Sequence, residues 1–153
     1  MEEGPRKVTI KVKRVNRNES GPLPTYMTEH AAGLDVCAFL EEDMLIAPGQ
    51  RGLIPTGLTV AIPEGFEIQV RPRSGLAIRD GLTLLNTPGT IDADYRGEIG
   101  ILMINHGEKT ISIRNGQRIA QLVVSRVFRA ELEEVDELPE SGRQGGGFGH
   151  TGL

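Results

Sequence analysis

Tryptophan is absent from this sequence of 153 residues, and the other aromatic residues are scarce, with four Phe and two Tyr. Stacking surfaces of the kind that bind single-stranded nucleic acid are therefore few. The formal net charge is −4, whereas non-specific binding of DNA or RNA normally depends on a basic face. The composition thus predicts no nucleic-acid partner. An anionic substrate would have to be bound locally, by clustered arginines, backbone amides or a metal ion.

Cysteine is almost absent as well, since Cys37 is the only one. A single cysteine excludes an internal disulfide, so nothing requires an oxidising compartment. The sequence has no apolar run of membrane-spanning length and no apolar signal segment near its beginning. We therefore expect a cytoplasmic protein without membrane contact.

Several catalytic signatures are also missing. The histidines His30, His106 and His150 are isolated and form no HExxH or Cys/His cluster, which argues against a zinc site. The sequence contains neither a phosphate-binding GxxxxGK[ST] loop nor a GxSxG nucleophile elbow. Cys37 lies in a strand-like run, where cysteine is more often a small buried residue than a nucleophile.

Short apolar segments separated by turn residues make up most of the chain. Residues 8–13 and 66–71 alternate apolar and polar side chains, the period of a half-buried strand. Further strands are expected in the Val-, Ile- and Leu-rich segments 34–39, 53–62, 99–105, 110–113 and 119–128. This spacing predicts an all-β, jelly-roll-like barrel or sandwich rather than alternating βαβ units.

Only one segment has the marks of a helix. Residues 74–79 form the candidate, with Ser74 as a possible N-cap and Gly81 just beyond the end. The first expectation for the fold is therefore a β domain with one short helix.

The C-terminal part changes in composition. Residues 131–140 are acidic and are expected to form a solvated connector, and six of the twelve residues 142–153 are glycine. We predict a single β domain at 1–140 and a flexible arm at 141–153. Residues 147–152 match GxGxxG literally, but a dinucleotide fingerprint requires a preceding strand and a following helix, so that interpretation is rejected.

A glycine-rich arm has two possible functions. Its backbone amides can converge on a phosphate without obstruction by side chains, while Phe148 could stack on a base and Arg143 and Thr151 could reach phosphate oxygens. The alternative is a disordered tail with no binding role.

Residues 71–75 read Arg-Pro-Arg-Ser-Gly. Two guanidinium groups, a hydroxyl and a helix start within five residues would suit a phosphate ligand. The alternative is a surface turn with solvated arginines.

Residues 86–97 place two carboxylates and a tyrosine in a turn-rich stretch between apolar segments. An Asp held in such a loop can deprotonate a water molecule. The alternative is a turn capped by its own carboxylates. Asp35 is an acid within an apolar strand, and it either faces solvent or is directed at a metal ion.

Taken in order, these segments resemble the five motifs of the trimeric dUTPase family. The resemblance rests on AGLDV at 32–36, PRSGL at 72–76, GTIDADYRG at 89–97, RIAQL at 118–122 and RQGGGFGHTG at 143–152. It implies a β-clip subunit with a jelly-roll-like fold, assembled as a homotrimer. The resemblance also implies three active sites at subunit interfaces, each with residues from all three chains, and a C-terminal arm that crosses over to close a site.

The resemblance implies a role for each matching residue. Asp92 is expected to be the general base and Tyr95 to pack against the deoxyribose. The uracil pocket is expected to be lined by Asn86, Gly89, Thr90 and Ile91. The phosphates are expected to be held by Arg73, Ser74, Gly75 and Gln121.

The remaining implied roles concern the metal ion and the arm. Asp35 is expected to position a hydrated Mg²⁺ through water. In the arm, Phe148 is expected to stack over the uracil. The phosphates are then enclosed by Arg143, Gly149, His150 and Thr151.

The implied reaction is Mg²⁺-dependent hydrolysis of dUTP to dUMP and pyrophosphate, which limits uracil incorporation into DNA and supplies dUMP for thymidylate synthesis. Two alternatives remain. A dCTP deaminase, or a bifunctional deaminase-dUTPase, would use a glutamate at the position that we align with Leu102. A non-catalytic nucleotide-sensing or interaction trimer of the same fold would lack Asp92, Phe148 or the phosphate ligands.

Overall fold

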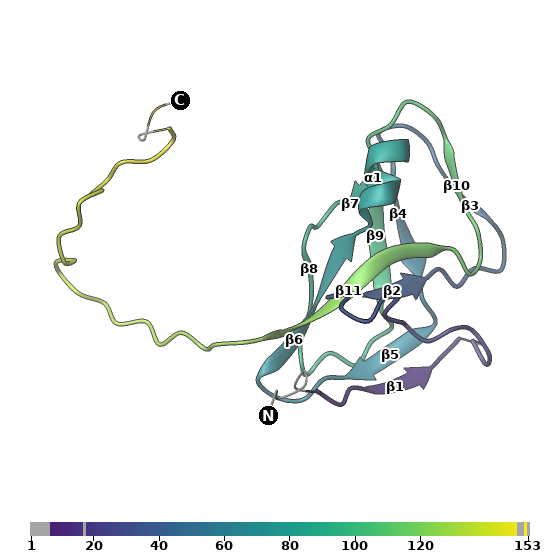
Figure 1. Cartoon of the computed structure of the whole chain (residues 1–153), viewed down its shortest axis with the longest axis horizontal. Helices are drawn as coiled ribbons and strands as arrows, with labels where there is room; N and C mark the ends of the chain where they lie inside the picture. The colour runs from purple at the N-terminus through teal and green to yellow at the C-terminus, as the bar shows by residue number, and fades with distance from the viewer. Residues whose placement is uncertain (1–6, 17, 150–151, 153) are drawn as a thin grey trace.

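The computed structural model describes residues 7–16, 18–149 and 152. It forms a strand-rich domain from which the C-terminal segment runs outward as an extended arm (Figure 1). The elements follow in the order β1 (Lys11–Arg14), β2 (Leu34–Cys37), β3 (Met44–Ile46), β4 (Arg51–Pro55), β5 (Leu58–Ala61), β6 (Phe66–Pro72), α1 (Ser74–Asp80), β7 (Leu82–Leu84), β8 (Gly89–Ile91), β9 (Gly100–Asn105), β10 (Ile111–Ile113) and β11 (Arg118–Arg126).

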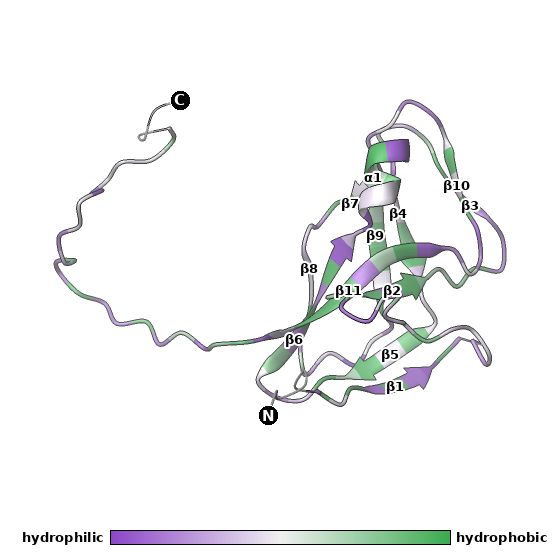
Figure 2. Cartoon of the chain, viewed as in Figure 1, coloured by the Kyte–Doolittle hydropathy of each residue, from purple (hydrophilic) through white to green (hydrophobic). Residues whose placement is uncertain are grey.

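Two larger antiparallel sheets form the body of the domain. One has the strand order β2-β11-β6-β8 and the other β4-β9-β7, while β1-β5 and β10-β3 are two-stranded pairs. The buried side chains from these sheets form one continuous core, to which β11 contributes Ile119, Ala120 and Leu122. Figure 2 shows apolar residues on the strands that line this core, whereas β1 is largely hydrophilic.

The all-β fold with one short helix is confirmed, with differences at particular elements. Residues 66–71 form most of β6 as predicted. The strand expected at 8–13 is confirmed only in part: it spans Lys11–Arg14 and its four residues are exposed, whereas Val8 and Ile10 just before it are partly buried. The three-residue strands β3, β7 and β8 were not predicted, since each is too short to show an alternating pattern.

The prediction of Ser74 as the N-cap is also wrong. Ser74 is the first helical residue, and Arg73 is the N-cap, with φ −91° and ψ 124° and no side-chain capping bond. The peptide N–H groups of Leu76 and Ala77 both donate to the carbonyl oxygen of Arg73. Gly81 ends the helix as predicted, in the left-handed conformation that glycine adopts readily, with φ 66°.

The C-terminal segment after β11, which we call the arm from here on, begins where β11 leaves the sheet and includes the predicted connector at 131–140. The N–H of Val127 donates to the carbonyl oxygen of Gly65 at 2.9 Å, and no helix or strand follows among the described residues up to 149. Phe128, Leu132 and Leu138 along the arm are exposed. The predicted acidic connector at 131–140 is thus solvated as expected. Within the described residues, no helix has the length and hydrophobicity needed to span a membrane.

Candidate active site

A cavity of about 160 Å³ lies beside β8; we call it the β8 pocket. The short strand β8 and the loops on either side of it supply most of its wall, and β6, β7 and β9 supply the rest. Six residues expected to act on the base, the sugar or the attacking water line it together: Asn86, Gly89, Thr90, Ile91, Asp92 and Tyr95. The structure thus gathers around one cavity six residues that the sequence placed only in a turn-rich stretch.

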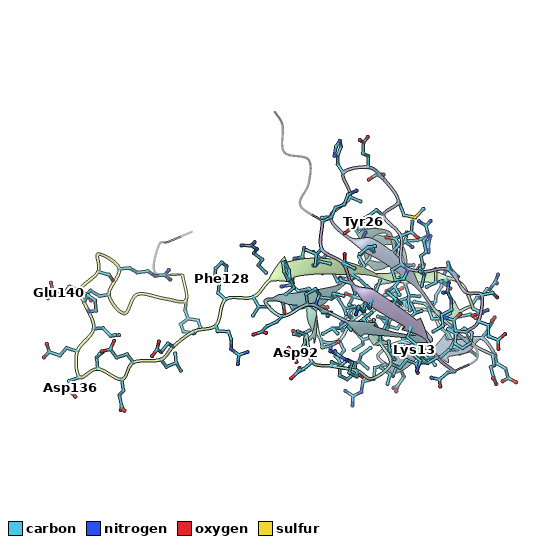
Figure 3. The ribbon with its side chains drawn as sticks, turned by 90° about the horizontal axis from the view of Figure 1, so that it is seen from below. Lys13, Tyr26, Asp92, Phe128, Asp136 and Glu140 are labelled. Atoms are coloured by element: carbon cyan, nitrogen blue, oxygen red, sulfur yellow. The ribbon has the colours of Figure 1, made fainter. Side chains whose placement is uncertain are left out.

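The turn that carries Asp92 is held without its carboxylate. The N–H of Tyr95 donates to the carbonyl oxygen of Asp92 at 3.1 Å. The guanidinium of Arg96 donates to the carbonyl oxygens of Ala93 and Tyr95. The Asp92 side chain is exposed and makes no hydrogen bond within the described parts of the chain, so the turn is not capped by it. Figure 3 shows Asp92 at the surface of the β domain.

An exposed, unpaired carboxylate can act as a base. Its oxygens remain available to accept a proton from a water molecule at the mouth of the β8 pocket.

A second group of side chains lies on β2, on β11 and just after β6. We call Asp35, Arg73, Arg118 and Gln121 the arginine cluster. The Oδ2 of Asp35 lies 3.1 Å from Nη1 of Arg118 and 3.4 Å from Nε of Arg73. The Oδ1 of Asp35 accepts a hydrogen bond from Nε2 of Gln121 at 3.2 Å. Two guanidinium groups and one carboxylate leave the cluster with one net positive charge.

Asp35 does not face solvent, as charged residues in strands usually do. Only 6% of its surface is exposed, and both of its oxygens have partners. Arg73 also donates from Nη1 to the carbonyl oxygen of Arg118 at 3.1 Å. The carboxylate therefore fixes the guanidinium of Arg73 and the amide of Gln121, both of which are expected to contact phosphate.

The other members of the expected phosphate site lie at the start of α1. Ser74 and Gly75 are exposed directly after Arg73, and no atom would lie within 4 Å of a side chain added at Gly75. A ligand could therefore approach this backbone closely. Arg71 takes no part in the cluster, because its Nη2 donates to Oε1 of Gln69.

Two residues of the site were not singled out from the sequence. Arg118 is the first residue of the RIAQL motif, three residues before Gln121. Regular alternation would put these two side chains on opposite faces, and a register shift between Arg118 and Ala120 interrupts that alternation. Glu98 lines the β8 pocket and directly follows the tyrosine motif. The partners of Glu98 come from distant parts of the chain, so no local sequence pattern indicates its contacts.

Gln121 of the arginine cluster and two lining residues of the β8 pocket, Val70 and Gly89, project to opposite faces of one sheet. Residues directly opposite each other in a sheet project to the same face, and successive residues project to opposite faces. Gln121 stands opposite both Asp35 and Arg71. Their neighbour Val70 stands opposite Gly89, and both of these line the pocket. Within the chain, the lining of the β8 pocket and the arginine cluster share no residue.

The arm residues do not reach either group within the chain. Phe148 is fully exposed, and Nε of Arg143 donates to the nearby carbonyl oxygen of Gly146. Gly149 follows Phe148 and is also exposed. His150 and Thr151 fall outside the described residues.

The described residues provide no ready-made metal site. Within 7–16, 18–149 and 152, no three His, Cys, Asp or Glu side chains gather in a way that could hold an ion. Asp35 is the only carboxylate of the arginine cluster, and it is engaged by two arginines. This donor set does not suit direct coordination, but it suits an ion that is held mainly by a ligand's phosphates and contacts the protein through water.

Cys37 lies at the end of β2, next to the arginine cluster. Burial raises the pKa of its thiol, and the charge of Arg118 opposes that effect. The thiol is therefore protonated at neutral pH and is a poor nucleophile, in agreement with the expectation from sequence.

Comparisons with known proteins agree on one family. The chain matches the dUTPase family model over residues 19–152. A deoxyuridine 5′-triphosphate nucleotidohydrolase from Syntrophotalea carbinolica is 56% identical over 146 residues, which cover 95% of this chain and 98% of that protein.

Solved structures of phage dUTPases have the same fold. A variant dUTPase of Staphylococcus bacteriophage 80alpha with dUpNHpp has a TM-score of 0.85 and 28% identity, covering 95% of this chain and 99% of that one. A variant dUTPase from phage phi11 of S. aureus has a TM-score of 0.75 and 26% identity, covering 84% of this chain and 97% of that one. The phi11 structure reveals the coordination of a structural Mg(II) ion.

Replacing Asp35 tests the arginine cluster. Asp35→Asn turns one acceptor into an N–H donor beside two guanidinium groups, so we expect the free energy of unfolding to fall by about 1–3 kcal/mol. The matched control is Asp43→Asn, because Asp43 is 57% exposed and lies 3.9 Å from Arg114. That change should cost less than about 0.5 kcal/mol. Thermal unfolding at equal protein concentration measures both, and equal losses would contradict the central position of Asp35.

Proposed function

Because the chain belongs to the dUTPase family, we propose that it hydrolyses dUTP to dUMP and pyrophosphate with Asp92 as general base. The Asp92 carboxylate takes a proton from water, the water oxygen attacks the α-phosphorus, and the bond from that phosphorus to the bridging oxygen breaks. Pyrophosphate leaves with the bridging oxygen. The observation that carries this proposal is the β8 pocket, which gathers the base, the tyrosine and a strand edge around one small cavity.

The edge position of β8 suits recognition of uracil. β8 is the last strand of its sheet and pairs only with β6, so one side of its backbone keeps unpaired N–H and C=O groups. These groups and the amide of Asn86 match the alternating acceptors and donor on the edge of uracil. Cytosine presents a different pattern and would leave buried polar groups unpaired, a strong basis for rejection. Tyr95 forms the wall against the deoxyribose, where a 2′-hydroxyl does not fit.

The arginine cluster suits the phosphates. Arg73 and Gln121 are held by Asp35, and Ser74 and Gly75 add a hydroxyl and free backbone beside them. A triphosphate would be repelled by a protein of net charge −4, so the local positive charge of this cluster is needed for binding.

Mg²⁺ completes the charge balance in our proposal. The ion neutralises phosphate charge when it is bound, and Asp35 is the residue that contacts its water shell. Every other step of the proposed reaction is carried out by side chains and backbone groups of the protein.

We place each complete site at an interface of a homotrimer, with residues drawn from all three chains. This placement is supported by the β8 pocket and the arginine cluster sharing no residue and by Gln121 projecting away from Val70 and Gly89. The outward face of β4-β9-β7 supports such an assembly, because Leu53 stands opposite Leu102 and Leu53 and Leu85 are 62% and 41% exposed. Exposed leucines grouped on one sheet face are typical of a surface that a partner covers. A cyclic trimer repeats one such contact three times.

The arm supplies the last part of the site. It leaves its own domain at Val127 and stays extended (Figure 3), so Phe148 and Arg143 are free to reach a neighbouring subunit. Phe148 stacks over the uracil, and Arg143, Gly149, His150 and Thr151 enclose the phosphates. Closure excludes water and strengthens each charged contact.

Leu102 counts against the deaminase alternative. It lines the β8 pocket and has no group that can transfer a proton. The non-catalytic alternative requires loss of the base or of the phosphate ligands, and Asp92, Arg73, Gln121 and Phe148 are all present. In a cell, the proposed reaction limits uracil incorporation into DNA and supplies dUMP for thymidylate synthesis.

Product analysis tests the function directly. The protein is incubated with Mg²⁺ and, separately, with dUTP, dCTP, dTTP and UTP, and the products are separated by chromatography. We expect dUMP and pyrophosphate from dUTP alone. Conversion of dCTP to dUTP or dUMP would establish the deaminase instead, and no product from any of the four would support the sensor.

Asp92→Asn tests the base. The amide keeps the shape of the side chain but cannot accept the proton, so kcat for dUTP should fall by about 10² to 10⁴ while nucleotide binding persists. Turnover is measured by pyrophosphate release and binding by calorimetry with dUMP or a non-hydrolysable analogue. Full activity in this variant would refute the assignment of Asp92 as the general base.

Mixing two inactive variants tests the shared site. Asp92→Asn damages the pocket and Arg73→Ala damages the cluster, and each is expected to be inactive alone. After subunit exchange at equal amounts, roughly a quarter of the sites combine an intact pocket with an intact cluster, because subunits mix at random. Activity should therefore recover. If pocket and cluster came from the same chain, mixing would restore nothing.

Deleting residues 141–153 tests the arm. Because the described residues of this segment hydrogen-bond only to one another, we expect a folded trimer with strongly reduced turnover. Circular dichroism and size-exclusion chromatography check the fold and assembly. Normal turnover in a truncated trimer would remove the arm from the mechanism.

A further inference from the structure

The ring of Tyr95 folds back over the turn that follows it. Its hydroxyl donates to the carbonyl oxygen of Glu98 at 3.0 Å. A Cβ atom added at Gly97 would lie 2.6 Å from Cζ of that ring and closer still to its hydroxyl. The ring thus occupies the space that any side chain at position 97 would need. The backbone at Gly97 does not adopt a positive φ, so its conformation alone does not require glycine. The position requires glycine because the Tyr95 ring fills the space beside it.

Glu98 fixes the same turn from the other side. Its Oε1 accepts a hydrogen bond from the N–H of Gly57 at 2.7 Å, and its Oε2 accepts one from the side-chain amide of Asn16. Gly57 precedes β5 and Asn16 follows β1, so one carboxylate ties the tyrosine turn to two distant segments. The carbonyl oxygen that receives the Tyr95 hydroxyl belongs to this anchored residue.

We infer that Gly97 and Glu98 are positioning residues that set the location of the Tyr95 ring and thereby the selectivity for deoxyribose over ribose. Glu98 holds the acceptor for the hydroxyl in place, and Gly97 leaves the ring its space. Tyr95 is 46% exposed, so packing alone does not hold its ring. A wall that excludes a single hydroxyl must be fixed to within a fraction of an ångström, and these two residues provide that constraint.

This inference rests on the proposed hydrolysis of dUTP and on the place of Tyr95 beside the sugar. It adds two residues to which that proposal gives no part. Neither residue needs to touch the substrate, since both act through the ring.

Gly97→Ala is the direct test. Alanine is compatible with the backbone at this position, and the atoms in its way are the far end of a side chain, so the variant should fold with the ring displaced. We expect the ratio of kcat/KM for dUTP to kcat/KM for UTP to fall about tenfold or more, the range set by small steric changes in a binding pocket. An unchanged ratio in the folded variant would overturn the role of Gly97.

Glu98→Ala and Glu98→Gln form the matched pair. Glutamine keeps an oxygen that can accept the N–H of Gly57, whereas alanine removes both contacts. We expect Glu98→Ala to lower the dUTP:UTP ratio and Glu98→Gln to restore most of it. If Gly97→Ala did not fold, this pair would decide the inference, and equal ratios in both variants and the unaltered protein would overturn it.

Tyrosine fluorescence separates this inference from the proposed function. The chain has no Trp and only two Tyr, so Tyr95 is the sole emitter in a Tyr26→Phe background. Displacement of the ring by Gly97→Ala should lower the anisotropy of that emission. If the unaltered protein did not hydrolyse dUTP, the proposed function would be refuted but the inference about the ring position would not. If the protein hydrolysed dUTP but substitutions at Gly97 and Glu98 changed neither the anisotropy of Tyr95 nor the dUTP:UTP ratio, the inference alone would be refuted.

Discussion

Strand β11 is hydrogen-bonded to β2 along one edge and to β6 along the other. Its register places Gln121 opposite Asp35 and Arg71 and turns the neighbours Ala120 and Leu122 into the core. A shift of one residue would bury Gln121 and expose Leu122, because successive side chains alternate between faces. The apolar core therefore fixes the polar cluster: the same pairing that buries Leu122 brings Gln121 within hydrogen-bond distance of Asp35.

Strand β8 forms an edge of the same sheet, and its unpaired backbone groups are available to a ligand. A strand edge with unpaired backbone groups is a liability in a soluble protein, because other strands can pair with it. β8 limits this risk by being only three residues long and by lying within a pocket. In the proposed function its unpaired groups are satisfied by uracil, so a feature that other proteins cover becomes the basis of base recognition.

Much of this arrangement could be predicted from the sequence, and the failures have physical reasons. Alternation identified residues 66–71 as a strand, and Gly81 marked the end of the helix, because both signals are local. β8 was missed because three residues carry no period. Ser74 was misplaced because the N-cap is Arg73, which makes no side-chain capping bond, so the residue preference for Ser at an N-cap does not apply here. The contacts of Glu98 with Gly57 and of Asp35 with Arg118 join residues far apart in sequence, and no local pattern encodes them.

The division of the site into two groups of residues separates folding from activity. A single folded chain already contains the β8 pocket with its exposed Asp92 carboxylate and the arginine cluster with its buried Asp35, and the two groups share no residue. The guanidinium groups of the cluster are paired with Asp35, not with Asp92. In the proposed homotrimer, assembly brings the carboxylate and the cations to the same nucleotide, with the phosphates between them. Activity should therefore follow the population of assembled subunits, whereas the stability of each β domain depends on its own core.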